Sequence, residues 1–217
     1  MKKKNCIFFG DSITDANHLF SRNPLGEGYL SALCELSHAA EIPFFFSNQG
    51  HDGHTLERLL DVFKRSWNHG ESLYGPWDLV AIQIGINDVC VCQNTGLSLA
   101  QQKSYLIHFQ HNLFSLLQEI RKDFSGILFV LEPFLFPYPS EFQSWMNLRE
   151  QFSLIMQEIS QDFHCIFLPL QSLLVGSCSL SRFSLLSTDG IHLTKTGNQL
   201  LASFLWEELC RIWDLKL

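Results

Sequence analysis

The chain has 217 residues, of which 46% are hydrophobic and 17% charged, and its formal net charge is −7. At roughly 100–200 residues per domain, this length predicts a single domain over residues 1–217, with a core that needs neither disulfides nor a structural metal. The acidic balance, without a basic run, argues against a nucleic-acid partner, because binding to phosphates needs clustered Lys and Arg.

The N-terminal segment differs from a signal peptide. It reads MKKKNCIFFGD; its apolar stretch is too short for a signal peptide, and no small-residue cleavage site follows. No apolar stretch approaches the length of about 18 residues that a membrane span requires. The 7 cysteines are odd in number and scattered, which is typical of reduced thiols. We therefore expect a cytoplasmic protein without an integral membrane segment.

Five short apolar runs predict β-strands, at residues 5–10, 42–47, 78–84, 126–131 and 165–168. The runs are almost continuously apolar, which indicates a parallel sheet covered by helices on both faces. Pro43 places the second run at a sheet edge or at a strand start, because proline cannot donate to a neighbouring strand. Cys90 and Cys92 are expected to alternate along a strand end, as small core residues rather than metal ligands.

Amphipathic segments between these runs predict helices. After Leu99 and again from Trp145, apolar residues recur mostly at steps of three and four, which places them on one helix face. The last helix is expected to begin near Thr194, a suitable N-cap residue, with Glu207 and Arg211 paired on its outer side. Weaker patterns predict helices at residues 29–39 and 56–67. The inward-facing residues are Tyr105, Phe109, Leu113, Leu116 and Ile120, then Trp145, Phe152, Ile155, Ile159 and Phe163, and finally Leu201, Phe204, Leu205, Leu209 and Ile212.

The alternation of strands and helices predicts an α/β fold, a three-layer α/β/α sandwich around a five-stranded parallel sheet. In such sheets the ligand site lies beyond the carboxyl ends of the strands. Polar blocks follow the first three strands at residues 10–14, 48–53 and 85–88, and a fourth precedes the last helix at 189–192. We therefore expect the first three blocks to meet at one rim of the sheet.

These blocks contain the parts of a serine esterase. Ser12, on the turn after the first strand, is the candidate nucleophile, and His192 is the candidate base because a neutral imidazole accepts protons near pH 7. Asp189 can hold the other imidazole nitrogen and stabilise the imidazolium. The backbone N–H groups of Ser12 and Gly50 and the side-chain amide of Asn87 are candidate donors to a tetrahedral oxyanion.

The four blocks, in this order, resemble those of the GDSL esterase/lipase family, the SGNH hydrolases. That family takes its second name from a Ser, a Gly, an Asn and a His in successive blocks, here Ser12, Gly50, Asn87 and His192. The resemblance extends from residue 8 to residue 200. It implies a flavodoxin-like fold and a serine mechanism with an acyl-enzyme intermediate, and no metal or organic cofactor. Leu193 stands where family members usually have Pro, which we interpret as a mild change in loop rigidity.

The segment at 132–134 is similar to the bacterial acyl-esterase branch, which includes carbohydrate acetylesterases and lysophospholipases. Candidate substrate-binding residues are Asp11, Phe134 and Tyr138. Asp11 is better explained as a residue that orients the turn before Ser12. The two aromatic residues are equally explained as a cap on the core. His51 and His54 are expected at the rim rather than as metal ligands.

The leading interpretation is a hydrolase of carboxylic esters with short acyl chains, such as acetyl esters of sugars or small molecules. A lysophospholipase, a thioesterase or an acyltransferase would use the same triad. Two further hypotheses are a metal-dependent phosphoesterase, which would need more ligands at the strand ends than the sequence offers, and a binding module without activity. The expected partner is a small-molecule, glycan or lipid ester. Acyl chain length and oligomeric state stay open, with residues 15–28, 90–100 and 135–141 as the expected determinants of specificity.

Overall fold

The structure, a computed structural model, describes residues 2–67, 75–176 and 182–215. In this part of the chain five strands form one parallel sheet in the order β2-β1-β3-β4-β5. All five predicted strands are confirmed, with small shifts at their ends. Their bounds are β1 Lys4–Gly10, β2 Phe44–Gly50, β3 Leu79–Gln83, β4 Ile127–Leu131 and β5 Ile166–Leu168.

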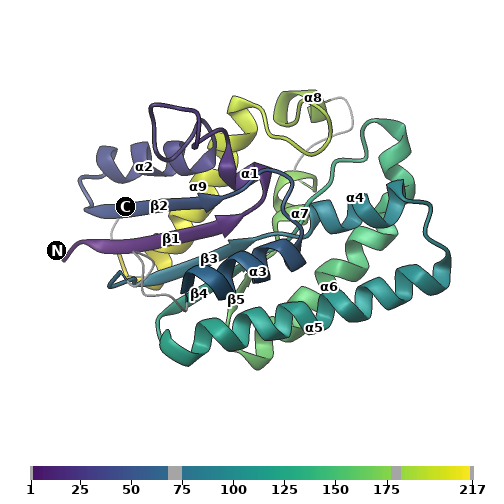
Figure 1. The fold of residues 1–217 in the computed structure, drawn as a ribbon. Helices are drawn as coiled ribbons and strands as arrows, with labels where there is room; N and C mark the ends of the chain where they lie inside the picture. The colour runs from purple at the N-terminus through teal and green to yellow at the C-terminus, as the bar shows by residue number, and fades with distance from the viewer. Residues whose placement is uncertain (1, 68–74, 177–181, 216–217) are drawn as a thin grey trace.

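Helices cover both faces of the sheet, as the α/β/α prediction requires. Figure 1 shows α2 and α9 packed together on one face, with α3, α5 and α6 on the other. No helix in the described ranges is long and apolar enough to cross a membrane. The bounds are α1 Ser12–Asp15, α2 Tyr29–Ala39, α3 Leu56–Trp67, α4 Ile86–Asn94, α5 Leu99–Asp123, the 3-10 helix η1 Ser140–Trp145, α6 Met146–Asp162, α7 Leu170–Leu174, α8 Phe183–Leu186 and α9 Lys195–Ile212.

The position of each strand in the sheet explains its pattern of apolar residues. All five residues of the central strand β3 are buried, because helices cover both of its faces. In β2, at the sheet edge, Phe44 and Phe46 are buried but Phe45 is exposed. Pro43 directly precedes this strand, and its carbonyl accepts a hydrogen bond from the backbone of Lys4. Both interpretations of this proline, sheet edge and strand start, are therefore confirmed.

Local signals set the starts of two helices. Thr194 is the N-cap of α9, and its hydroxyl accepts a hydrogen bond from the backbone N–H of Gly197 at 3.1 Å. Ser98 caps α5 in a capping box with Gln101, so that each side chain bonds the other residue's backbone N–H. The two weaker helices predicted at 29–39 and 56–67 are also confirmed, as α2 and α3.

Two local expectations were wrong. Cys90 and Cys92 lie on helix α4 rather than at a strand end, because β3 stops at Gln83 and Gly85 turns the chain into the helix at φ +117°. Arg211 forms an ion pair with Glu208, at 2.6 Å, instead of with Glu207. Residues three and four apart in the sequence both lie on the same side of a helix. Here the guanidinium of Arg211 binds Glu208, three residues earlier, rather than Glu207, four residues earlier.

The sheet brings the first three polar blocks to one edge. Gly10, at the end of β1, pairs in register with Gly50 on one side and with Gln83 on the other. The three strands therefore end level with one another, and the segments that follow them share a rim. At Gly50 a side chain would collide with the backbone of Asp15, so glycine is needed there for α1 to pack against β2.

Candidate active site

Ser12 is the first residue of the short helix α1, which begins directly after β1. Asp11 caps this helix, because its carboxylate accepts a hydrogen bond from the backbone N–H of Ile13 at 3.0 Å. As the first residue of a helix, Ser12 has no carbonyl four residues earlier in the helix for its own N–H to bond. The turn thus presents the Ser12 hydroxyl and its amide together at the rim.

The loop between α8 and α9 brings His192 and Asp189 to Ser12 from the far end of the chain. The Nε2 atom of His192 lies 3.0 Å from the Oγ atom of Ser12, and its Nδ1 atom lies 2.7 Å from Oδ2 of Asp189. The other oxygen of Asp189 accepts the backbone N–H groups of Ile191 and His192, at 2.9 and 2.7 Å. The three side chains therefore form one continuous hydrogen-bonded chain, which fixes the orientation of the imidazole.

These contacts also determine the charge of Asp189. Partial burial alone would raise the pKa of this carboxyl. Hydrogen bonds from the ring and backbone of His192 and from the backbone of Ile191 outweigh burial, and the pKa lies below its usual value. Asp189 is thus ionised at neutral pH and suited to stabilise a positive imidazolium.

The two other candidate oxyanion donors already have partners. The side-chain amide of Asn87, on α4, donates to the backbone carbonyl of His54 at 2.9 Å, which leaves its second hydrogen available. The backbone N–H of Gly50 donates to the side-chain oxygen of Asn48 at 2.9 Å. Gly50 can therefore donate to a substrate oxygen only if it shares or releases this bond.

Two carboxyl groups are buried beneath the rim. Burial raises the pKa of Asp11 to about 8, against the hydrogen bond from Ile13, and its Oδ2 atom has no hydrogen-bond partner in the described residues. Burial likewise raises the pKa of Asp88 to about 7. Asp88 accepts hydrogen bonds from the backbone of Leu56 and the hydroxyl of Tyr105, at 3.1 and 3.0 Å. It therefore ties α3 and α5 to α4 beneath Asn87.

The histidines of the second block stack on each other. The rings of His51 and His54 are 4.7 Å apart and nearly parallel. Burial, followed by the nearby charges of His51 and Arg58, lowers the pKa of His54. In the ranges that the structure describes, no group of three or more His, Cys, Asp or Glu side chains could hold a metal ion.

The three candidate substrate-binding residues differ in their exposure to solvent. Asp11 and Phe134 are fully buried, and Phe134 packs edge-on against Phe136. Neither side chain reaches the surface, because Asp11 is turned inward by its capping role and Phe134 completes the core. Tyr138 alone is accessible, with 47% of its surface exposed.

Several polar residues that build the rim were not singled out from the sequence. The side-chain amide of Asn48 donates to the carbonyls of Thr14 and Leu25, at 2.7 and 3.0 Å. The carboxylate of Asp15 forms a hydrogen bond with the Nδ1 atom of His18 at 2.7 Å and accepts one from the backbone N–H of Asp52 at 3.0 Å. The position of Asn48, at the start of the block that contains Gly50, is the only signal in the sequence that pointed to it.

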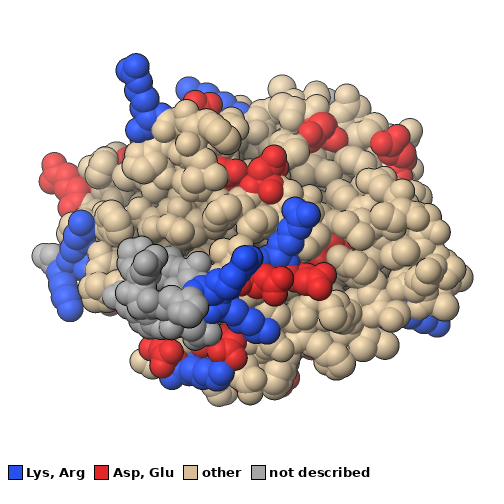
Figure 2. All heavy atoms as spheres, in the orientation of Figure 1, with Lys and Arg blue, Asp and Glu red and all other residues tan. Residues whose placement is uncertain are grey.

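Ser12 and His192 both line a cavity of about 510 Å³. Three acidic residues also line it, and Figure 2 shows acidic side chains over α1, while the Lys and Arg side chains on this face gather mainly around α3. The full lining is Ser12, Ile13, Asp15, Ala16, Asn17, Phe20, Glu27, Gly28, Asp52, His192, Leu193 and Asn198.

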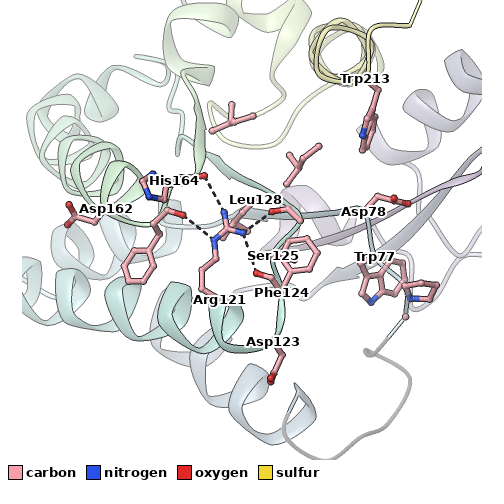
Figure 3. A pocket seen from close by; sticks show the side chains of 16 residues that line it. Trp77, Asp78, Arg121, Asp123, Phe124, Ser125, Leu128, Asp162, His164 and Trp213 are labelled. Atoms are coloured by element: carbon pink, nitrogen blue, oxygen red, sulfur yellow. Dashed lines mark hydrogen bonds between the residues drawn. The ribbon is translucent and has the colours of Figure 1, made fainter.

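A larger cavity, of about 1040 Å³, lies at the opposite end of the sheet, near the amino ends of β3 and β4 (Figure 3). The guanidinium of Arg121 donates to the backbone carbonyls of Phe163, Gly126 and His164, at 3.1, 2.8 and 3.2 Å. Arg121 therefore joins the end of α5 to the segments that precede β4 and β5. Ser12 and His192 line the smaller cavity, so the candidate active site lies there.

Comparisons with known proteins identify the family and the fold. The chain matches a family model of GDSL-like lipases and acylhydrolases over residues 8–200. A putative GDSL-like lipase from Parabacteroides merdae is similar in structure, with a TM-score of 0.78 and 23% identity over 94% of each chain. The acetylxylan esterase Axe2 from Geobacillus stearothermophilus has a TM-score of 0.77 and 23% identity over 95% of this chain and 94% of its own.

A third similar structure is LAE5, an alpha/beta hydrolase from the metagenome of Lake Arreo, with a TM-score of 0.76 and 23% identity over 99% of this chain and 97% of its own. No curated protein matches the sequence significantly. At these identities the solved structures establish the shared fold, and the family model covers most of the chain. The chain therefore belongs to the GDSL-like lipase/acylhydrolase family, and it is a carboxylic ester hydrolase.

Proposed function

We propose that this protein hydrolyses carboxylic esters with short acyl chains, such as the acetyl esters of sugars or small molecules, with Ser12 as nucleophile. One observation carries the proposal: Ser12 Oγ, both ring nitrogens of His192 and the carboxylate of Asp189 form a single chain of hydrogen bonds. A nucleophile, a base and a residue that orients the base are the three parts such a mechanism needs.

The first half of the reaction forms an acyl-enzyme. As Oγ of Ser12 attacks the ester carbonyl, Nε2 of His192 takes the hydroxyl proton, and the carbonyl π electrons move to oxygen. Asp189 stabilises the imidazolium that results. When the tetrahedral intermediate collapses, the bond to the alcohol oxygen breaks and His192 returns its proton to the departing alcohol.

The second half releases the acid. A water molecule gives a proton to Nε2 of His192 and attacks the acyl carbonyl, and collapse of this second intermediate expels Oγ of Ser12, which takes the proton back. In both intermediates the negative oxygen needs fixed donors. The N–H of Ser12 and the second amide hydrogen of Asn87 are suited to this role, joined by the N–H of Gly50 if it leaves Asn48.

The short acyl chain and the sugar alcohol are supported by analogy and by the polar lining of the cleft. Axe2 is described as an acetylxylan esterase, and among its solved structures are catalytic mutants with a serine or an aspartate replaced by alanine. Both residue types are present in the triad proposed here. A lysophospholipase would need a long apolar acyl site, whereas many of the residues that line the cleft beside Ser12 are polar or charged.

The test is hydrolysis of a p-nitrophenyl ester series, from acetate to palmitate, by the wild type and by Ser12→Ala. We expect activity on short chains only, a loss of about 10³-fold or more in kcat for Ser12→Ala, and no effect of EDTA. Ser104→Ala, at an exposed site on α5, is the matched control and should behave as wild type. Retained turnover in folded Ser12→Ala would overturn the mechanism, and a long-chain optimum would favour a lysophospholipase. Loss of activity in EDTA would show that the hydrolysis depends on a metal ion and would also overturn the mechanism.

A further inference from the structure

We propose that the cleft beside Ser12 selects esters by charge, accepting cationic and neutral groups and rejecting anionic ones, and that Glu27, Asp52 and Phe20 set this preference. The proposal rests on the proposed function, because it concerns what the same site accepts. It assigns a role to the residues around the nucleophile. The triad by itself does not determine which esters the cleft accepts.

Among the described residues that line it, the cleft has three carboxylates and no Lys or Arg. The carboxylates are those of Asp15, Glu27 and Asp52, which line it together with Ser12 and His192. A cavity lined by charges of one sign raises the local concentration of oppositely charged ligands and lowers that of like-charged ligands. An ester with a phosphate or carboxylate in this cleft would face uncompensated repulsion.

The three carboxylates have different roles. Asp15 is buried and fully engaged, with His18 on one oxygen and the backbone N–H of Asp52 on the other. Glu27 and Asp52 are exposed, and within the described ranges neither forms an ion pair shorter than 4.0 Å. The charges available to a substrate are therefore those of Glu27 and Asp52.

The backbone of both residues with free carboxylates is held in place before a substrate arrives. The N–H of Glu27 donates to the carbonyl of Ala16 at 2.8 Å, next to α1. The N–H of Asp52 donates to the carboxylate of Asp15, which belongs to α1. The backbone of both residues is thus anchored to the short helix that carries Ser12 or to the residue that follows it, which keeps the two side chains beside the nucleophile.

Phe20 provides the apolar surface of the same cleft. Its side chain is 92% exposed although it is a large apolar residue, and it lines the cavity with Glu27 and Asp52. Its backbone is held by a hydrogen bond from its own N–H to the carbonyl of Asn17, at 3.0 Å. An aromatic face next to carboxylates suits an alkylammonium group, through a cation–π contact, and also the apolar face of a neutral ring.

The experiment uses three phenyl acetates that differ only in a para substituent attached through a methylene group: a carboxylate, a carboxamide or a trimethylammonium. Each kcat/KM is divided by the rate constant for hydroxide-catalysed hydrolysis of the same ester, which corrects for intrinsic reactivity. For the wild type at low salt we expect the order cationic, neutral, anionic. The ratio between the extremes should be about 20-fold to 50-fold, since each exposed carboxylate contributes about threefold and the contact with Phe20 about twofold to fivefold. Added NaCl should reduce this ratio.

The variants assign the preference to residues. Glu27→Gln and Asp52→Asn should each reduce the ratio about threefold, and together they should leave only the roughly twofold to fivefold preference that Phe20 contributes. Phe20→Leu should lower the cationic ester about twofold to fivefold and leave the anionic ester unchanged. Glu158→Gln, which removes an exposed carboxylate on α6 outside the cleft, is the matched control.

Equal corrected rates for the three esters in the wild type, or a double variant that keeps the full wild-type ratio, would overturn the proposal. Turnover without a charge order would leave the proposed function intact, whereas turnover retained in Ser12→Ala would remove that function. A binding measurement separates the two questions further. Calorimetric titration of folded Ser12→Ala with benzyltrimethylammonium and with phenylacetate should detect binding of the cation only. The opposite result, or equal binding, would count against charge selection whatever the activity.

Discussion

The side chain of Asn48 accepts the hydrogen bond of the Gly50 backbone N–H at 2.9 Å. Its amide at the same time donates to the carbonyls of Thr14, Leu25 and Asp15, at 2.7, 3.0 and 3.3 Å. One buried side chain thus joins the end of β2 to the helix that carries Ser12 and to the segment before α2. The proposed donor to a substrate oxygen and the support of the proposed nucleophile therefore depend on the same residue.

We therefore expect Asn48→Asp to destabilise the protein. A carboxylate cannot donate to the three carbonyl oxygens, and it would place a negative charge beside them in a buried site. The free energy of unfolding should fall by about 2–4 kcal/mol, measured by urea denaturation near neutral pH. Asn147→Asp, at an exposed position on α6, is the control and should change it little. Equal stability of the two variants would contradict the linking role of Asn48.

Asn87→Ala should lower kcat far more than it changes KM. The substitution removes an amide that is suited to bind the oxygen in the transition state, and it also releases the carbonyl of His54. The expected loss in kcat is about 10²–10³-fold, measured with p-nitrophenyl acetate. Asn94→Ala, at the exposed end of the same helix, should keep wild-type kinetics. A kcat within a few-fold of the wild type would exclude Asn87 from the set of oxyanion donors.

Asp189→Asn tests the third member of the proposed triad. An amide at this position would bond the imidazole in the wrong tautomer and would not stabilise the imidazolium, so kcat should fall by about 10³–10⁴-fold. Because Asp189 is half exposed, its replacement should have little effect on the unfolding midpoint. Asp162→Asn, on the exposed end of α6, provides the charge-matched control. A loss of less than tenfold would show that the orientation of His192 does not depend on this carboxylate.

The buried carboxyl of Asp11 should make stability depend on pH. Its pKa is raised by burial to about 8 in the folded protein, against about 3.9 when unfolded. Between these values the folded state holds a proton that the unfolded state has released, so the free energy of unfolding falls as pH rises toward about 8 and levels off above it. The raised pKa of Asp88, about 7, acts in the same direction.

Asp11→Asn isolates the contribution of the Asp11 carboxyl group to the pH dependence. An amide has the same shape and still accepts the hydrogen bond from the N–H of Ile13, but it does not ionise. Urea denaturation from about pH 5 to about pH 8 should give a shallower fall for the variant, by up to about 1.4 kcal/mol per pH unit. Asp61→Asn, at an exposed site on α3, should retain the wild-type slope. Parallel curves for wild type and Asp11→Asn would mean that Asp11 stays ionised in the folded protein.

Much of the fold was predictable because the local pattern of apolar residues indicates which segments are buried. The strands under both helical layers are continuous apolar runs, and Pro43 marked the sheet edge because it lacks an amide hydrogen. Thr194 marked the start of α9 through its capping hydroxyl. The helix α4 was not predicted, because its sequence lacks such a local pattern. It is short and has several buried residues, such as Ile86, Asp88 and Val89, so it has no polar face and no clear period.

The candidate active site followed from sequence in two respects. Parallel strands of similar length end at one rim, so the sequence places the blocks after β1, β2 and β3 together. The pairing of His192 with Ser12 and Asp189 was also predicted, and the structure has these contacts at 3.0 and 2.7 Å. The sequence by itself therefore determined the sheet, its helical layers and the residue types available to the site. The surroundings of those residues were decided by tertiary structure: Asn48 lies under Gly50, Asp11 is turned inward, and Glu27 and Asp52 line the cleft beside Ser12 with no Lys or Arg among the described residues that line it. Such contacts join segments that are far apart in the chain, and their geometry exists only once the sheet and helices have packed.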